Sequence, residues 1–104
     1  MLRQRTTLTV SGSQTNSSQV SAVAGRRIRV IGFTITATSA TATTVQFTDV
    51  TTTSALSGTY EVPGSSTINI PSVDNGYGDT ASGHALGVTT GSGAVTIDLI
   101  YEVK

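Results

Sequence analysis

The ten residues from 94 to 103 carry the pattern that most restricts the fold of this chain. From residue 94 to residue 103 a large apolar side chain occupies every second position; these are Val95, Ile97, Leu99, Tyr101 and Val103. The positions between them are polar or small, except for Ile100. A period of two over five apolar positions predicts a β-strand with one face against a core. Ile100, apolar on the polar side, is a candidate contact with a neighbouring strand or subunit.

The composition favours the same class. About a third of the 104 residues are Ser or Thr, and threonine is β-branched, which suits strands better than helices. Charged residues make up 12% of the chain and the net charge is +0, without the basic excess that nucleic acid or an anionic membrane attracts. The chain has no cysteine, which excludes disulfides and thiolate metal sites.

The segment from Arg26 to Ala37 contains a change of parity. Ile28 and Val30 share one parity, whereas the apolar residues that follow share the other, and the change falls at Val30-Ile31-Gly32. One extra residue in a β-bulge reverses the facing of everything after it, so we predict a bulge there. A strand buried on both faces is the alternative.

Short β-prone runs separated by turn residues recur along the rest of the chain. Seven to eight short antiparallel strands at this spacing predict one all-β domain, either a jelly roll or another β-sandwich. We assign residues 20–104 to this sandwich and residues 1–19 to an N-terminal strand or arm. No apolar run approaches a membrane span, and the first residues lack the apolar core of a signal peptide, so we expect synthesis and folding in a cytoplasm.

Motifs for chemistry are weak. His84 is the one imidazole, and Gly83-His84-Ala85-Leu86-Gly87 has alanine where a hydrolase elbow needs its nucleophile. Asp74, Asn75 and Asp79 share a Gly-rich loop and offer oxygen ligands for calcium, but such residues more often serve turn geometry. We therefore predict no enzyme, no cofactor and no metal site, and we take His84 as a surface or interface residue.

The basic residues Arg26, Arg27 and Arg29 form the one concentration of charge. Arg27 and Arg29 are predicted to point away from the core, either to solvent or to a partner, and arginine is enriched at protein interfaces. The long irregular stretch 71–83 places Tyr77 in a segment of the length that often has a function. Tyr60 and Tyr77 are also the aromatic residues left to stack on a sugar, so a glycan ligand stays open.

The order of these features resembles a known family. An Ala-Gly-basic turn (24–27) leads into an apolar strand (28–35), a Thr/Val strand (44–47), a Pro-bounded loop, Gly83-His84-Ala85-Leu86 and a final Tyr-Glu-Val strand end. Over residues 20 to 104 this is similar to the capsid decoration, or cement, proteins and head-fibre bases of tailed bacteriophages.

The resemblance implies a jelly roll or similar sandwich that binds the outer surface of an assembled head. It also implies the major capsid protein as partner, homotrimers at local three-fold positions and a location on the virion surface. The alternatives are a tail, fibre or spike module of a phage and a carbohydrate- or cell-surface-binding sandwich. The interface candidates are Arg26, Arg27, Arg29, Tyr77, His84 and Ile100.

Overall fold

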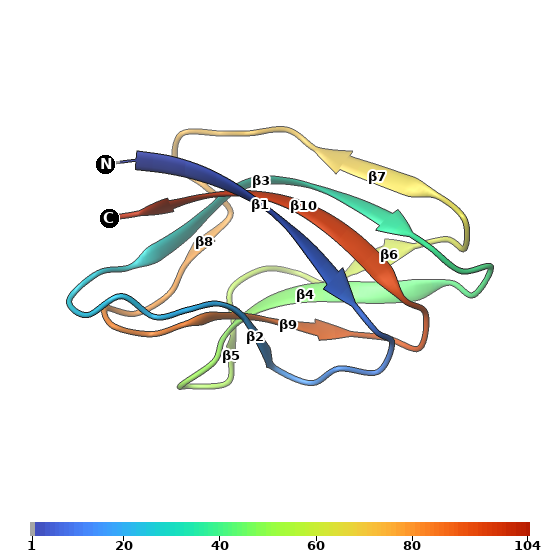
Figure 1. The fold of residues 1–104 in the computed structure, drawn as a ribbon, viewed down its shortest axis with the longest axis horizontal. Coiled ribbons are helices and arrows are strands. Elements are labelled where there is room, and N and C mark those ends of the chain that lie inside the picture. Colours follow the sequence, from blue (N-terminus) through green and yellow to red (C-terminus); the bar gives the residue numbers. More distant parts are fainter. Residues whose placement is uncertain (1) are drawn as a thin grey trace.

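Two antiparallel β-sheets pack face to face, in a computed structural model that describes residues 2–104 (Figure 1). The first sheet has the order β1-β10-β3-β7, with β8 also paired to β3; the second has the order β2-β9-β4-β5, with β6 also paired to β4. The first sheet consists of β1 (Leu2–Val10), β3 (Ile28–Ala37), β7 (Thr67–Ile70), β8 (Gly78–Asp79) and β10 (Val95–Val103). The second consists of β2 (Ser17–Val20), β4 (Thr43–Asp49), β5 (Ser54–Ala55), β6 (Tyr60–Val62) and β9 (Leu86–Thr90).

The topology is that of a jelly roll. The chain crosses between the sheets from β1 to β2, to β3 and to β4, and then again after β6, β8 and β9. Two four-stranded paths, β1-β10-β3-β7 and β2-β9-β4-β6, are the two halves of a jelly roll built from Greek keys. The predicted all-β sandwich is confirmed. It has ten strands where the sequence predicts seven to eight, because β5 and β8 are extra two-residue pairings.

The N-terminal residues form part of both sheets. The sequence sets residues 1–19 apart as a strand or arm, and the structure pairs β1 with β10 at every position from Leu2 to Val10. Ser17 and Ser18 then pair with β9 in the second sheet. The described residues of this segment therefore belong to the same sandwich as residues 20–104.

The bulge in β3 is confirmed at its predicted place. Gly32 pairs with Ile100 and Val30 pairs with Tyr101, so Ile31 is the residue without an opposite number on β10. On either side of it Val30 and Phe33 both face the core. Ile31 itself is fully buried but lies outside the main core cluster, and its carbonyl accepts the N–H of Val73 at 3.1 Å. The bulge thus anchors the loop after β7 to the sheet.

An aromatic cluster holds the two sheets together. The ring of Phe33 meets Phe47 edge-on at a centroid distance of 4.8 Å, Tyr60 at 5.2 Å and Tyr77 at 5.8 Å. Edge-to-face contacts between aromatic rings stabilise the fold beyond the gain from burying the rings alone. The Tyr77 hydroxyl also donates to the Pro71 carbonyl at 2.6 Å. Tyr60 and Tyr77 therefore support the core, and neither ring is a free platform for a sugar.

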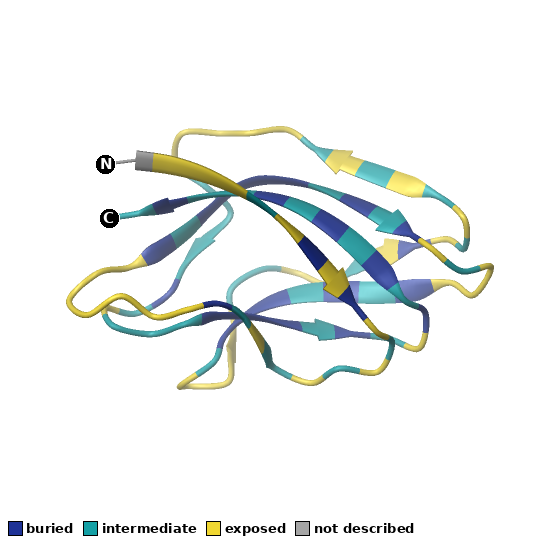
Figure 2. Cartoon of the chain, in the orientation of Figure 1, coloured by how far each residue is buried: buried dark blue, intermediate teal, exposed yellow. Residues whose placement is uncertain are grey.

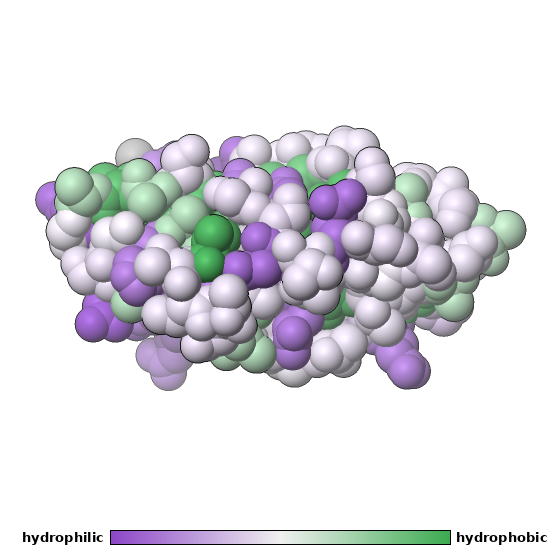
Figure 3. Space-filling view, turned by 90° about the horizontal axis from the view of Figure 1, so that it is seen from below, coloured by the Kyte–Doolittle hydropathy of each residue, from purple (hydrophilic) through white to green (hydrophobic). Residues whose placement is uncertain are grey.

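The outer faces of the sandwich are covered by small polar side chains. One row across the first sheet is made of Thr9, Thr96, Thr36 and Thr67, and the next of Thr7, Asp98, Thr34 and Asn69. Hydrogen bonds tie neighbours in these rows together, such as Thr34 to Asn69 at 2.9 Å. The view from below, over the second sheet, is mostly pale and has no broad apolar patch (Figure 3). Burial follows the same alternation along the strands (Figure 2).

Candidate functional site

β1 begins and β10 ends at the same end of the elongated molecule (Figure 1). Charged side chains gather at this end. The molecule measures 40 × 25 × 19 Å, so its two ends are well separated surfaces. We call this end the charged end; its members are Arg3, Arg26, Arg27, Arg29, Asp74, Asp79, Glu102 and Lys104.

Most charges at the charged end are paired. Arg29 Nε and Nη2 donate to the two carboxylate oxygens of Asp79 at 2.8 and 3.0 Å, and Lys104 Nζ lies 3.8 Å from the same carboxylate. The hydrogen bonds from Arg29 lower the pKa of Asp79 below its ordinary value. Arg3 donates to Glu102 at 3.0 Å and to Asp74 at 2.6 Å.

Arg29 corrects one expectation from the sequence. It was predicted to point to solvent or a partner beside Arg27, but its side chain is only 20% exposed and is fixed by Asp79 across the β3–β8 pair. The reason is the short strand β8, which pairs with this part of β3 and places Asp79 opposite Arg29. No local pattern in the sequence predicts β8. Asp74 and Asp79, the two carboxylates of the calcium alternative, bind different arginines and do not converge.

The turn of residues 23–27, here the arginine turn, presents the cations that remain. Arg26 and Arg27 are exposed, and neither side chain has a hydrogen bond or ion pair within residues 2–104. Their backbone is fixed: Gly25 has φ +70°, Arg26 N–H donates to Val23 at 3.0 Å, and Arg26 C=O accepts from Gly83 at 2.8 Å. Val23, 42% exposed, lies in the same turn.

Two further backbone hydrogen bonds close the arginine turn against the end of the chain. Arg27 N–H donates to Lys104 C=O and Lys104 N–H donates to Arg27 C=O, both at 2.9 Å. The turn therefore combines two unpaired guanidinium groups, an exposed apolar side chain and a rigid backbone. Exposed arginine is enriched at protein interfaces, and a backbone that is already fixed loses little conformational freedom when a partner binds.

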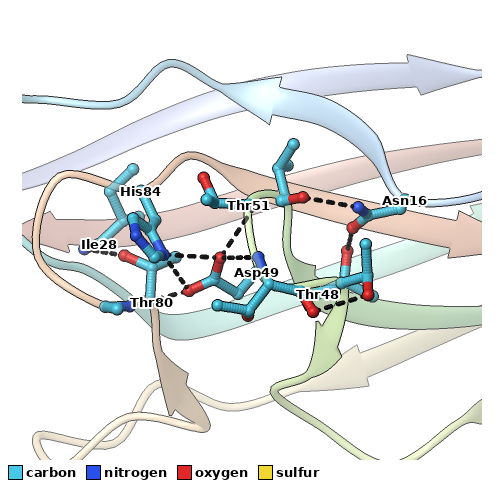
Figure 4. Close-up of polar contacts among 11 residues, drawn as sticks. Asn16, Ile28, Thr48, Asp49, Thr51, Thr80 and His84 are labelled. Carbon is cyan, nitrogen blue, oxygen red and sulfur yellow. Dashed lines mark hydrogen bonds and ion pairs between the residues drawn. The ribbon is translucent and has the colours of Figure 1, made fainter.

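His84 and Asp49 form a second, more enclosed arrangement near the same end (Figure 4). Asp49 is 3% exposed, and its carboxylate lies 3.0 Å through each oxygen from His84 Nδ1. The N–H groups of Thr51, Thr52 and Ala81 donate to it at 3.0, 3.2 and 2.9 Å. Burial alone raises the pKa of Asp49, but the N–H groups of Ala81 and Thr52 and the imidazole of His84 outweigh it and lower the pKa to about 2.

The Asp49 carboxylate joins three separate segments. It binds the turn that follows β4, the N–H that follows Thr80, and the imidazole that precedes β9. Thr80 extends the connection, because its hydroxyl accepts the N–H of Ile28 at 2.9 Å at the start of β3. The sequence indicates His84 but not Asp49 as a candidate. The pattern that could have indicated Asp49 is an apolar strand that ends in Asp before a Thr-rich turn.

The opposite end of the molecule carries no charge in its turns. We call it the small-residue tip; it comprises residues 11–14, 38–42, 63–66 and 91–94, all without Asp, Glu, Lys or Arg. A Cβ on Gly12 would collide with the Ser92 carbonyl, and one on Gly64 with the Ala40 carbonyl. Backbones touch there because glycine allows it. A groove of about 450 Å³ flanks the tip, lined by residues that include Thr44, Glu61 and Ser92.

The sequence candidates lie in three separate places. Arg26, Arg27 and His84 lie at or beside the charged end. Ile100 lies apart, half-buried on the outer face of the first sheet, in a shallow groove of about 260 Å³ that also includes Arg5 and Asp98. Tyr77 belongs to the core-facing side of its loop.

The comparisons with known proteins bear on the fold. No family model matches the chain, and no curated protein matches it. Among solved structures, a Bacillus endospore appendage protein, described as one of a novel family of disulfide-linked pili, has a TM-score of 0.55. It is 10% identical, over 98% of this chain and 84% of that one. This likeness shows the fold alone.

Two further solved structures are similar over most of the chain. The structure of PirA has a TM-score of 0.49 at 15% identity, covering 91% of this chain and 92% of that one. The C-terminal domain of EclA, described as a sugar-binding protein, has a TM-score of 0.49 at 11% identity, covering 100% of this chain and 79% of that one.

The described part of the chain contains no helix long and apolar enough to cross a membrane. Within the same residues, no three His, Cys, Asp or Glu side chains are grouped closely enough to hold a metal ion.

Proposed function

We propose that this chain is a capsid decoration protein of a tailed bacteriophage, which docks the charged end onto an acidic surface of the assembled head. The arginine turn is the observation that carries the proposal. Arg26 and Arg27 are unpaired cations on a rigid support, next to exposed Val23, while the neighbouring charges are neutralised within the fold.

Because the neighbouring charges are paired with one another, the charged end presents a positive surface to a partner. Asp79, Glu102 and Asp74 are each bound by a cation of the chain itself. What the charged end offers to a partner is therefore the pair of guanidinium groups on residues 26 and 27. Arginine binds carboxylates through two parallel hydrogen bonds, so the partner surface is one that presents Asp or Glu side chains.

Decoration of this kind stabilises a particle by mass action. A protein that binds the assembled head and not its dissociated subunits shifts the equilibrium toward the head. Weak contacts suffice when copies act together, as in the three-fold clusters that we propose at local three-fold positions. The role needs binding and no catalysis, and we propose that the Asp49–His84 pair holds loops together and takes no part in a reaction.

The test is co-sedimentation of the purified protein with undecorated heads of the phage that encodes it. The wild type should sediment with heads, and Arg27→Glu should bind about ten-fold more weakly, because it opposes the acidic surface. Thr15→Glu, which adds a negative charge at an exposed site away from the arginine turn, is the control for the added carboxylate and should bind normally.

Two results would overturn the proposal. One is unchanged binding of Arg27→Glu together with binding that does not weaken as salt is raised, since exposed ion pairs are screened by salt. The other is electron-microscopy density for this chain on the tail of the virion rather than on the head.

A further inference from the structure

β1 has a long, regular and unpaired edge. Among the described residues, the other strands at sheet edges are two to four residues long: β2, β5, β6, β7 and β8. β1 has nine residues, all paired with β10 without a shift of register, and no other strand on its second side. Many proteins keep their edge strands short, which prevents unwanted pairing with another chain. β1 has nine residues and is not protected in this way.

The side chains of β1 do little to block a partner strand. The strand Leu2–Val10 contains no proline or glycine and no bulge. On its outer face Arg3 is bound to Glu102 and Asp74, which leaves Arg5 as the one cation of β1 without an ion pair. The residues at core parity, Gln4 and Thr6 among them, are uncharged. Figure 2 shows β1 exposed over much of its length.

The sandwich is also open beside this edge. A cleft of about 270 Å³ lies between β1 and residues 19–23, and its lining includes Gln4, Val20 and Tyr101. The Tyr101 hydroxyl donates to Gln4 Oε1 at 3.0 Å across the mouth of the cleft. A strand added to β1 would place its own core-parity side chains over this opening.

We propose that the occupant is the β1 strand of a second copy of this chain, antiparallel and related by a two-fold axis at Thr6. This register pairs Leu2 with Val10 of the second copy and Thr6 with its counterpart, so all nine residues take part. Each arginine then stands opposite a threonine, Arg3 opposite Thr9 and Arg5 opposite Thr7. A two-fold contact is closed, so it produces a dimer and not a fibre.

The charges favour this register over its neighbours. Sliding by two residues in one direction places Arg5 opposite Arg5 of the second copy, and sliding in the other direction shortens the ladder. Like charges directly opposite one another destabilise a pair of strands. Of the registers that keep both core faces on the same side, the one centred at Thr6 avoids both penalties.

Asp98 supplies the complementary charge. Thr7 pairs with Asp98 on β10, and its hydroxyl donates to Asp98 Oδ1 at 2.8 Å, which leaves Oδ2 free for a cation. In the dimer Arg5 of the second copy lies opposite Thr7, two strand spacings or about 10 Å from the Asp98 backbone. Extended arginine and aspartate side chains cover that distance. Neither Arg5 nor Asp98 has an ion pair within the described residues of one copy.

The inference concerns the isolated protein and does not depend on the proposed function.

The experiment is sedimentation of the full chain over a range of concentrations, with exchange of backbone amides in parallel. The wild type should reach twice the chain mass, and β1 amides should be more protected at concentrations where the dimer forms. Arg5→Glu should weaken the dimer about ten-fold, because the change counts at two symmetry-related pairs and replaces attraction by repulsion. Arg5→Glu combined with Asp98→Arg should restore it.

Thr59→Glu adds a negative charge at an exposed site outside β1 and outside the arginine turn, so it is the control for added charge and should dimerise like the wild type. A wild type that stays monomeric at the highest soluble concentration overturns the proposal, as does one that forms only trimers. A dimer that Arg5→Glu leaves unchanged would place the contact elsewhere and overturn the proposal. So would a dimer whose β1 amides gain no protection.

Discussion

The imidazole of His84 faces the carboxylate of Asp49 with Nδ1 3.0 Å from both oxygens, on a carboxylate that is 3% exposed. With backbone donors from two loops on the same oxygens, this contact joins the turn after β4 to the segment before β9. A single ionised side chain thus connects the loops at one end of the second sheet.

We expect acid to weaken the fold through Asp49. Its pKa is lowered from 3.8 to about 2 in the folded protein, so the ionised form is favoured by folding. The sign follows: the stabilisation is fully present above about pH 4 and is lost as the pH falls from there toward 2, by about 2 kcal/mol in total. Urea unfolding at a series of pH values measures it.

Asp49→Asn is the control for this prediction. The amide cannot titrate, so the variant should be less stable at neutral pH, and its stability should change less between pH 4 and pH 2 than that of the wild type. Equal acid dependence in the two proteins would assign the effect to other carboxylates.

Replacing glycine at the small-residue tip should destabilise the fold where two backbones are in contact. A Cβ on Gly64 would collide with the Ala40 carbonyl, so Gly64→Ala should destabilise the fold by about 1–3 kcal/mol. Gly58→Ala is the matched control, because no atom lies within 4 Å of its added Cβ and its φ is not positive. It should be neutral, or more stable by a few tenths of a kcal/mol, since alanine restricts the unfolded chain. Thermal unfolding compares them, and equal losses would contradict the prediction.

Removing Ile31 should leave a folded protein. Because Ile31 is the unmatched residue of the bulge, its deletion lets Val30 and Gly32 follow one another against Tyr101 and Ile100 with every other side chain facing as before. The loss is the burial of one isoleucine, about 1.5–3 kcal/mol, and the anchor to Val73. Amide exchange should therefore rise in residues 71–77 while the sheets stay protected.

Deleting Ile35 provides the contrast. Ile35 lies in the regular part of β3, opposite Ile97, so its removal reverses the facing of one half of the strand. This variant should not fold. If both deletions behave alike, the bulge does not have the role that its register indicates.

The bulge was predictable because it changes a local pattern: the apolar residues occupy even positions up to Val30 and odd positions from Ile31 on. The faces of β10 were predictable for the same reason. The partners of Arg29 and His84 were not, since Asp79 and Asp49 are 50 and 35 residues away in the sequence. Nothing in a short window shows which loops a jelly roll brings together. Edge strands were equally hidden, because strand order depends on how the two sheets are connected.

A pair of buried threonines offers a last test, with opposite expected signs. The hydroxyl of Thr43 is buried without a hydrogen-bond partner, so Thr43→Val removes an unsatisfied polar group and should stabilise the fold by about 1 kcal/mol. The hydroxyl of Thr80 is fully buried and accepts the Ile28 N–H at 2.9 Å. Thr80→Val leaves that N–H without its acceptor and should cost about 1–3 kcal/mol. Denaturant unfolding of both variants beside the wild type measures the difference. A destabilising Thr43→Val would mean that its hydroxyl has a partner, such as bound water at the nearby groove, and that the tip is wetter than its packing indicates.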